Sequence, residues 1–239
     1  MNILITGVSK GLGLEITKKL LKEGHNVFGL SRTKTEGLAL LKSNYNDRLN
    51  LLNYDLVNSE DINKNIFKSF LGKTPLHAFI NNAAIAYDDI ITNANLNRLN
   101  DMFAVNTFTP IILTKYAIRN MILHKTKGSI IHISSISVHT GYKGLSMYAA
   151  SKGALEAFSK NTAREWGSLA IRSNCIVAGF MDTEMSSSLS ESQKNRIYQR
   201  TSLKNAVSPK SIASTISFLI SDEAKSITGQ NIHVDSGTI

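Results

Sequence analysis

The sequence has few of the features that mark secreted, metal-binding or membrane proteins. Its 239 residues include one cysteine, Cys175, so the chain cannot form an internal disulfide and metal sites built from paired cysteines are excluded. No window approaches the roughly 18 apolar residues of a membrane-spanning helix. The first residues, MNILITG, lack the basic flank and the length of a secretion signal. These absences predict a cytoplasmic protein without a bound metal.

Acidic residues are also scarce. There are 18 Asp and Glu against 27 Lys and Arg, which gives a formal net charge of +9. Nucleic-acid-binding proteins concentrate such cations on one patch, whereas here they are scattered and pairs such as Lys18–Lys19 are the longest runs. We therefore expect a solvated basic surface that favours small anions, and neither a nucleic-acid nor a membrane partner.

The chain has no linker, repeat or low-complexity segment, and short apolar runs alternate with helical patterns. Runs such as SIIHIS and HAFINN are apolar on both faces, which is typical of strands buried in a parallel sheet. Strand–helix alternation with right-handed crossovers predicts an α/β fold: a doubly wound parallel sheet of the Rossmann type, with about seven strands and helices on both faces. We expect one domain over residues 1–239. The expected strands are Asn2–Thr6, Asn26–Leu30, Leu49–Tyr54, Leu76–Asn81, Ser129–Ser134, Arg172–Val177 and Asn231–Val234, and the expected helices are 12–23, 36–43, 59–70, 96–122, 149–166, 182–198 and 209–221.

A glycine-rich loop follows the first expected strand, where residues 5–13 read ITGVSKGLG. Gly7, Gly11 and Gly13 permit positive φ and a close approach of the backbone to a ligand. The amides at the start of the next helix then face an anion. The spacing differs by one residue from the G-x-G-x-x-G fingerprint of dinucleotide-binding proteins. The loop predicts a pyrophosphate site, although by itself it also fits a tight turn without a ligand.

The loop and the motifs that follow it resemble those of the short-chain dehydrogenase/reductase family. The family fingerprint TGxxxGxG matches residues 6–13, and its YxxxK motif matches YAASK at 148–152. The family has Gly and Pro where this chain has Ala84 and Ala178, and neither change removes a reacting group. The match covers essentially the whole chain. The remaining motifs are NYDL, which contains Asp55, INNAAI at 80–85, HISSIS, REWGSLAIRSNCIVAGFMDTEM at 164–185 and ITGQNIHVDSG at 227–237.

Tyr148 and Lys152 lie four residues apart at an expected helix start, so they share one helix face. A nearby ammonium lowers the pKa of a phenol, which would suit Tyr148 for acid–base catalysis. An isolated YxxxK also fits two exposed residues on an amphipathic helix. The resemblance adds Ser135, thirteen residues before Tyr148, as the group that hydrogen-bonds the substrate oxygen, with Ser134 and Ser137 as neighbours open to confusion.

Asn106 is the fourth expected catalytic residue. Pro110 follows it by four residues in a helical pattern and has no N–H, so the Asn106 carbonyl loses its partner and the helix is expected to kink. The resemblance implies that Asn106 helps to hold a water that contacts Lys152 and so extends a proton path from Tyr148. A purely structural proline kink is the alternative.

The end of the second strand bears on the choice of cofactor. The stretch reads FGLSRT, so Ser31 stands where NAD-specific family members place an acidic residue, and Arg32 follows. An Arg can bind a 2′-phosphate with paired hydrogen bonds, and Lys10 supplies a second cation. We expect NADP(H) to be preferred, with NAD(H) as the alternative.

The resemblance also implies individual contacts to the cofactor. Asp55 is expected to bond the adenine amino group, Thr183 the nicotinamide amide and Lys152 the ribose. The full expected cofactor-binding set is Gly7, Ser9, Lys10, Gly11, Leu12, Gly13, Ser31, Arg32, Asp55, Leu56, Asn82, Ala83, Ala84, Tyr148, Lys152, Gly179 and Thr183.

These motifs predict an oxidoreductase that converts a ketone to a secondary alcohol, or the reverse. The chain most resembles 3-oxoacyl-[acyl-carrier-protein] reductases, and Lys125 and Lys127 would suit an acidic carrier protein, but Leu169 falls near a second place where those enzymes are basic. A sugar or another small polar substrate therefore stays open, as does a non-catalytic dinucleotide sensor or scaffold on the same fold. The expected substrate pocket comprises Ala86, Tyr87, Ser137, Tyr142, Leu145, Phe180 and the stretch around Met185–Leu189.

Helices 96–122 and 149–166 have more apolar positions than one sheet face covers. A helix that is apolar nearly all round is buried on both sides, and the resemblance implies pairing of these helices across a two-fold axis. We expect a homodimer or homotetramer. The apolar positions in question are Phe103, Phe108, Ile112, Tyr116, Ala154, Phe158 and Trp166.

Overall fold

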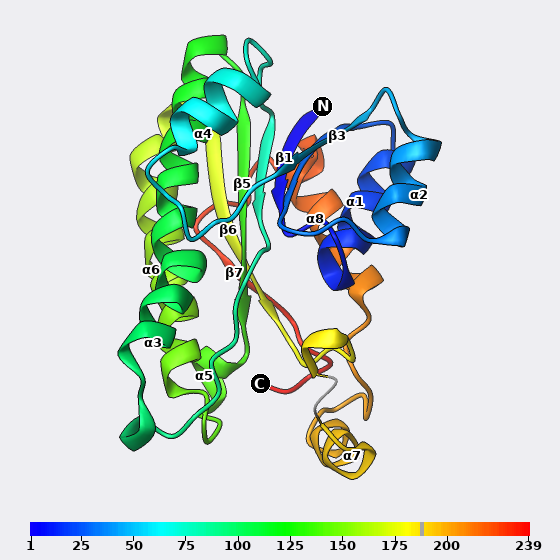
Figure 1. The fold of residues 1–239 in the computed structure, drawn as a ribbon, viewed down its shortest axis with the longest axis vertical. Helices are drawn as coiled ribbons and strands as arrows, with labels where there is room; N and C mark the ends of the chain where they lie inside the picture. The colour runs from blue at the N-terminus through cyan, green and yellow to red at the C-terminus, as the bar shows by residue number, and fades with distance from the viewer. Residues whose placement is uncertain (187–188) are drawn as a thin grey trace.

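The computed structural model describes residues 1–186 and 189–239. Within these ranges, seven parallel strands form one sheet in the order β3-β2-β1-β4-β5-β6-β7 (Figure 1). The predicted Rossmann-type α/β fold is confirmed, and the strand ends differ from the predicted ones by two residues at most. The strands are β1 (Asn2–Thr6), β2 (Asn26–Ser31), β3 (Leu49–Asn53), β4 (Ala78–Asn81), β5 (Gly128–Ser135), β6 (Ile171–Ala178) and β7 (Asn231–Val234).

Helices cover both faces of the sheet, as the doubly wound topology requires. In Figure 1, α1, α2 and α8 lie on one side of the sheet, and α4 and α6 lie on the other. The α-helices are α1 (Gly11–Lys22), α2 (Glu36–Asn44), α3 (Leu96–Phe103), α4 (Thr109–His124), α5 (Ser137–Thr140), α6 (Ser146–Trp166), α7 (Glu191–Gln199) and α8 (Pro209–Ile220). None of the helices described is long and apolar enough to cross a bilayer.

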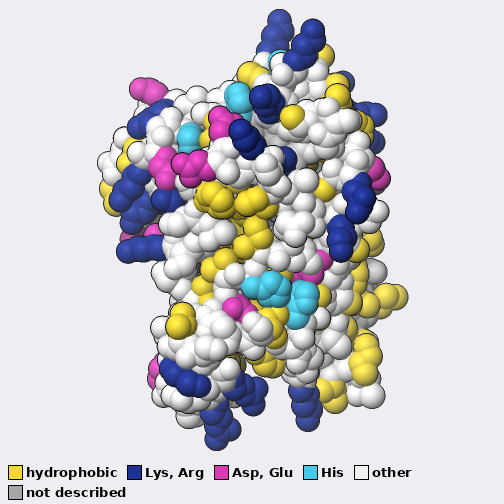
Figure 2. Space-filling model, turned by 180° about the vertical axis from the view of Figure 1, so that it is seen from behind, with side chains coloured by type: hydrophobic (Ala, Val, Ile, Leu, Met, Phe, Trp, Pro, Cys, Tyr) yellow, Lys and Arg dark blue, Asp and Glu magenta, His cyan; other side chains and the backbone are white. Residues whose placement is uncertain are grey.

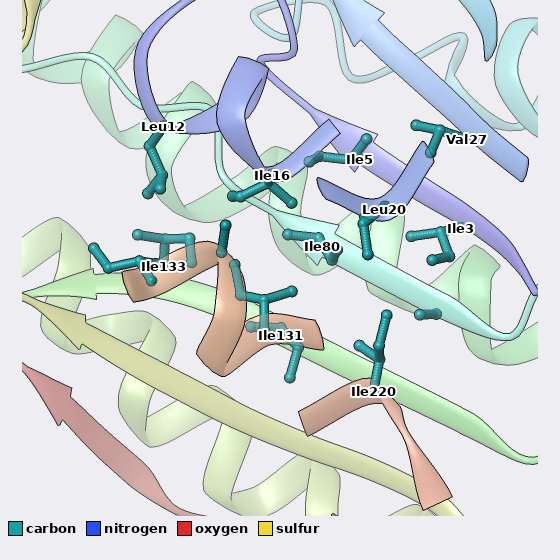
Figure 3. Packing of buried hydrophobic residues seen from close by; sticks show 14 of the residues in the cluster. Ile3, Ile5, Leu12, Ile16, Leu20, Val27, Ile80, Ile131, Ile133 and Ile220 are labelled. Atoms are coloured by element: carbon teal, nitrogen blue, oxygen red, sulfur yellow. The ribbon is translucent and has the colours of Figure 1, made fainter. Parts of the chain in front are cut away.

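The core beneath α1 and α8 shows how the sequence pattern produces this packing. Leu12, Ile16 and Leu20 recur every four residues, so they share the face of α1 that is turned to the sheet. There they meet buried isoleucines of β1, β4 and β5, while Ile220 closes the cluster from α8 (Figure 3). Each fully buried Leu or Ile contributes about 1.5–3 kcal/mol relative to an exposed one. This packing fixes the start of α1 against the end of β1.

Three predicted helices differ from the observed ones. Residues 59–70 form a π-helical segment only over Asn63–Phe70. The predicted helix 96–122 is divided into α3, a π-helical segment at Ala104–Phe108 and α4. Near Pro110 the hydrogen bonding departs from the α-helical pattern, since the Thr109 N–H donates to the Ala104 carbonyl, five residues back. Pro110 lies in the first turn of α4, where no N–H is needed.

The predicted helix 182–198 is likewise not continuous. A 3₁₀ turn spans Glu184–Ser186 and α7 begins after Ser190, whose side chain and backbone form a capping box with Gln193. Such a box defines a helix start, so the helix cannot extend backwards through Ser190. Residues 187–188 of this prediction lie outside the described residues.

Strand order reverses between β1 and β4, which neighbour each other although β2 and β3 separate them in sequence. In doubly wound sheets the crevice at the carboxyl ends of the strands next to such a switch point is the usual ligand site. The glycine-rich loop follows β1, and the NNAA sequence (81–84) begins at the end of β4. The fold therefore brings these two motifs together.

Candidate active site

A cleft of about 720 Å³ runs along the carboxyl ends of the strands. Every expected cofactor-binding residue lines it, and so do Ser135, Tyr148 and Lys152. Asn106 does not line it. Of the expected substrate pocket, Ala86, Ser137, Tyr142, Leu145, Phe180 and Leu189 line the cleft. Residues 187–188 and the Met185 side chain lie outside what the structure describes.

Tyr87 is the one described residue of that expected substrate pocket that does not line the cleft. It is buried in a small cluster with Met102 and Met147. Its hydroxyl accepts a hydrogen bond from the Asn95 N–H at 2.7 Å and donates to the Asn93 carbonyl at 3.2 Å. The prediction for Tyr87 is wrong because its hydroxyl fixes the loop that follows β4, and therefore does not face the cleft.

Close backbone approach explains the glycines of the first loop. Gly7 and Gly11 have φ of +75° and +52°, in the left-handed region. A Cβ on Gly13 would lie 1.9 Å from the Gly7 carbonyl oxygen, so no side chain fits there. The first turn of α1 consequently packs directly on the loop, with its N-terminal end toward the cleft.

Thr6 and Asn82 join this loop to the end of β4. The Thr6 hydroxyl accepts hydrogen bonds from the N–H groups of Asn82 and Ala83, both at 3.0 Å. The Asn82 side chain donates to the carbonyls of Thr6 at 3.0 Å and Gly7 at 3.2 Å. Thr6 was not among the expected site residues, although it is the first residue of the TGxxxGxG fingerprint.

The two departures from the family pattern are accommodated without strain. Ala84 is not among the described residues with positive φ, so glycine is not required there. Ala178 is the last residue of β6, and its carbonyl accepts the Ile136 N–H at 3.0 Å. The adjacent Gly179 is constrained, since a Cβ there would lie 2.5 Å from the Asp235 Cα.

Tyr148, Lys152 and Ser135 meet at the centre of the cleft. Tyr148 and Lys152 lie in the first turns of α6, and Ser135 is the last residue of β5. The Lys152 Nζ donates to the Ile133 carbonyl at 2.8 Å and lies 5.9 Å from the centre of the Tyr148 ring. The Ser135 Oγ accepts from the Ser137 hydroxyl at 3.0 Å.

The pKa of Tyr148 is higher than the sequence suggested. The pKa is raised to about 12, mainly by burial and also by the Asp88 carboxylate, while a hydrogen bond with Ser135 acts in the opposite direction. The net shift is thus opposite to the expected one, because desolvation of the phenolate outweighs any lowering by the Lys152 ammonium. At neutral pH, Tyr148 therefore holds its proton.

Lys152 is the most deeply buried cation near the cleft, with 1% of its surface exposed. Burial lowers the pKa of its ammonium to about 8, because the charged form loses its hydration. The neutral His132, which is fully buried on β5, has a pKa lowered to about 3 by burial and by the Lys152 charge. Lys152 thus lies close to its titration point near neutral pH.

The Asn106 side chain forms hydrogen bonds with two segments that are distant in sequence. Its Oδ1 accepts the Ile85 N–H at 2.8 Å, and its Nδ2 donates to the Ile85 carbonyl at 2.9 Å and the Ser151 hydroxyl at 3.0 Å. It therefore ties the loop after β4 to the turn of α6 that carries Lys152.

Ser134 differs from Ser135 in its hydrogen-bond partner. Its hydroxyl donates to the carboxylate of Glu156, a buried residue of α6. The His139 ring lies 3.0 Å from the same carboxylate, and Asn231 donates to it at 2.7 Å. No motif indicated this network behind Ser135, although a charged residue on the buried face of a helix was an available signal.

Opposite charges meet at the other end of the cleft. The Lys10 Nζ lies 2.7 Å from the Glu184 Oε2. Arg32 is exposed at the end of β2, and the Asp55 Oδ1 accepts the Val57 N–H at 3.1 Å. The Lys10–Glu184 pair forms between two loops that are far apart in sequence, and no motif predicted it.

Comparison with known proteins agrees with this arrangement. The family model described as enoyl-(acyl carrier protein) reductase matches residues 7–238. The chain belongs to the short-chain dehydrogenase/reductase family. An L-xylulose reductase of Caenorhabditis elegans is 31% identical to this family member over 238 residues, which cover 98% of the chain and 94% of the relative. The 3-oxoacyl-[acyl-carrier-protein] reductase FabG of Salmonella typhimurium is 33% identical, with 98% and 95% covered.

Solved structures of other proteins superpose along nearly the whole chain. A 4-hydroxyisoleucine dehydrogenase complexed with NADH and succinate has a TM-score of 0.90 and 30% identity, with 99% of this chain and 98% of that one covered. ElxO with NADP bound has a TM-score of 0.89 and 26% identity, with the same coverage. The neighbours thus include complexes with both dinucleotides.

Buried Lys152 gives the protein without cofactor a pH-dependent stability. Its pKa is about 8 when folded against an ordinary 10.5, so at this group the unfolded chain binds more protons between these values, and the Lys152 contribution to the free energy of unfolding rises with pH across that window. This contribution is at most about 3 kcal/mol, and the buried Cys175 thiol, whose pKa is raised to about 12, opposes it at the alkaline end. The test therefore compares variants by urea melts from about pH 8 to about pH 10. The free energy of unfolding should change more positively with pH in the wild type and in Lys160→Met, which removes an exposed lysine from α6, than in Lys152→Met. Equal slopes in both variants would contradict the assignment.

Proposed function

We propose that the protein is an NADP(H)-dependent oxidoreductase that reduces a ketone to a secondary alcohol, with Tyr148 as the general acid. The observation that carries the proposal is that one cleft is lined both by the glycine-rich loop and by Tyr148, Lys152 and Ser135. Backbone amides at the start of a helix suit a pyrophosphate. When bound, the nicotinamide supplies the hydride.

The protonation of Tyr148 favours the reductive direction. A general acid must hold its proton before the reaction begins, and the raised pKa of about 12 keeps the phenol neutral. The Tyr148 hydroxyl donates its proton to the carbonyl oxygen of the ketone, while the carbonyl carbon accepts the hydride. The Ser135 hydroxyl, beside Tyr148 in the cleft, positions the same oxygen.

Lys152 then has two tasks. Its ammonium would orient the cofactor ribose, and its charge stabilises the phenolate left on Tyr148 after proton transfer. Because Asn106 bonds Ser151 and Ile85, it holds the turn that carries Lys152 and supports the path by which Tyr148 regains a proton.

The adenosine end of the cleft supports NADP(H) over NAD(H). Neither residue at the end of β2, Ser31 or Arg32, carries the carboxylate that would repel a 2′-phosphate. Arg32 and Lys10 both line the cleft, and guanidinium pairs well with phosphate. Asp55 would bind the adenine amino group, and Thr183 the nicotinamide amide.

The substrate end is mixed in character. Leu145 and Phe180 are apolar, whereas Ser137, Tyr142 and Lys143 are polar or charged. Relatives named for L-xylulose and for 3-oxoacyl groups on a carrier protein make a sugar-like ketone and a 3-oxoacyl thioester the two substrate classes to test.

Replacing Tyr148 by Phe tests the catalytic assignment. The change removes the proton donor and keeps the ring, so kcat for NADPH oxidation with a responsive ketone should fall at least about 100-fold. NADPH binding, followed by nicotinamide fluorescence, should stay nearly unchanged. Activity within a few-fold of the wild type would refute the role of Tyr148. A wild type that binds NADPH but reduces no ketone would favour the sensor or scaffold alternative.

Replacing Arg32 by Ala tests the cofactor preference. Loss of a charge-assisted hydrogen bond should weaken NADPH binding by roughly 1.5–3 kcal/mol and leave NADH binding almost unchanged. Lys34→Ala is the matched control, because Lys34 is an exposed cation of the same loop that does not line the cleft. Equal weakening of both dinucleotides by Arg32→Ala would show that Arg32 does not contact the 2′-phosphate.

We also infer that the protein assembles with copies of itself. Phe108 and Leu123 of the α4 region are 57% and 76% exposed. However, Ile112, Tyr116 and Trp166 pack partly against the protein's own core, so the uncovered area is smaller than the sequence suggested. Figure 2 shows a band of hydrophobic side chains down the middle of another face, and β7 is an edge strand. Extended apolar surface of this kind marks interaction sites.

Light scattering at micromolar concentration tests the assembly. A homodimer or homotetramer should have about two or four times the chain mass of 26.2 kDa, because closed two-fold symmetries predominate in soluble oligomers. A mass near that of one chain would refute the inference. If the face that carries Phe108 forms the interface between subunits, Phe108→Ser should have a lower mass than the wild type.

A further inference from the structure

An ion pair in the lining of the cleft joins two loops that are distant in sequence. Lys10 belongs to the glycine-rich loop before α1, and Glu184 begins the 3₁₀ turn that follows β6. The Lys10 Nζ and Glu184 Oε2 lie 2.7 Å apart, and each side chain is 62% exposed. Both residues line the cleft, so the pair connects the loops on its two sides.

The loops themselves approach each other closely. A Cβ on Gly11 would lie 3.9 Å from the Cβ of Thr183, the neighbour of Glu184. The two segments are therefore neighbours at this point, which brings the Glu184 carboxylate within reach of Lys10.

Arg32 lines the same cleft from the end of β2. Under the proposed function, the 2′-phosphate of NADPH binds where Lys10 and Arg32 can reach it. Lys10 must then exchange a carboxylate for a phosphate, and the Glu184 charge repels the incoming dianion. Exposed ion pairs stabilise weakly, by less than about fivefold in an equilibrium constant. The 2′-phosphate therefore displaces the Glu184 carboxylate from Lys10, but NADPH binds more weakly than it would without that carboxylate.

We propose that Glu184 is a specificity-determining residue that limits the preference for NADPH over NADH by competing with the 2′-phosphate for Lys10. The proposal rests on the NADP(H) dependence proposed above. It follows that loss of the carboxylate strengthens the binding of NADPH. NADH has no 2′-phosphate and is indifferent to the change.

Glu184→Gln tests this with equilibrium binding, followed by nicotinamide fluorescence for NADPH and NADH. We expect the Kd of NADPH to fall about three- to tenfold, the scale of one exposed ion pair plus removal of one nearby like charge, and that of NADH to change less than about twofold. The matched control is Glu191→Gln, which makes the same charge change on α7. Glu191 is 81% exposed, pairs with Lys194 at 3.1 Å and does not line the cleft, so it should change neither Kd.

A double mutant separates competition for Lys10 from general electrostatics. In a Lys10→Met background, Glu184→Gln should strengthen NADPH binding by a clearly smaller factor than in the wild type. The wild-type effect should also shrink as ionic strength rises from about 0.05 M to about 0.5 M, because exposed charges are screened. Titration with 2′,5′-ADP and 5′-AMP should reproduce the difference between NADPH and NADH.

The outcomes distinguish this inference from the proposed function. NADPH binding that is unchanged or weakened in Glu184→Gln, equal strengthening of NADH, or an equal effect of Glu191→Gln would each overturn the role of Glu184 while leaving the reductase proposal intact. A wild type that binds neither dinucleotide would overturn both.

Discussion

The hydrogen bonds between Thr6 and Asn82 hold together the two strands at which the sheet reverses its order. The Thr6 hydroxyl accepts two backbone N–H groups from the end of β4, and the Asn82 amide donates to two carbonyls at the end of β1. Beyond the backbone pairing of β1 with β4, they hold the glycine-rich loop against the loop that Asn106 ties to α6. Because partly buried polar groups are costly to leave unpaired, this junction has one favoured geometry, and the cleft follows from it.

The second constraint is the burial of ionisable groups around that cleft. Lys152 and Tyr148 are driven toward their neutral forms by desolvation, which lowers one pKa to about 8 and raises the other to about 12. A protein that only needed stability would replace such groups by apolar ones, since burying an ammonium is unfavourable. Perturbed groups of this kind cluster at functional sites. The distribution of burial therefore points to the same residues as the motifs do.

Much of the fold was predictable because its signals are local. Buried parallel strands are short runs that are apolar on both faces, and the positions of β1 and β7 agree with the predicted ones residue for residue. The glycine positions were also readable, since close contacts such as that of Gly13 with the Gly7 carbonyl exclude every side chain. The predicted helices failed where local backbone hydrogen bonding or capping interrupted the periodicity, as in the π-helical segment before Pro110 and the capping box at Ser190.

The sequence by itself determined the order of strands and helices along the chain, the glycine-rich loop and the spacing of Tyr148 and Lys152. Each of these depends on residues that are close together in the sequence. Only the tertiary structure decided the direction in which the pKa of Tyr148 moves, the pairing of Lys10 with Glu184 and the network around Glu156. Desolvation depends on everything packed around a group. An ion pair between residues 10 and 184 depends on where two distant loops meet. Neither the desolvation nor the meeting of the loops can be predicted from the local sequence.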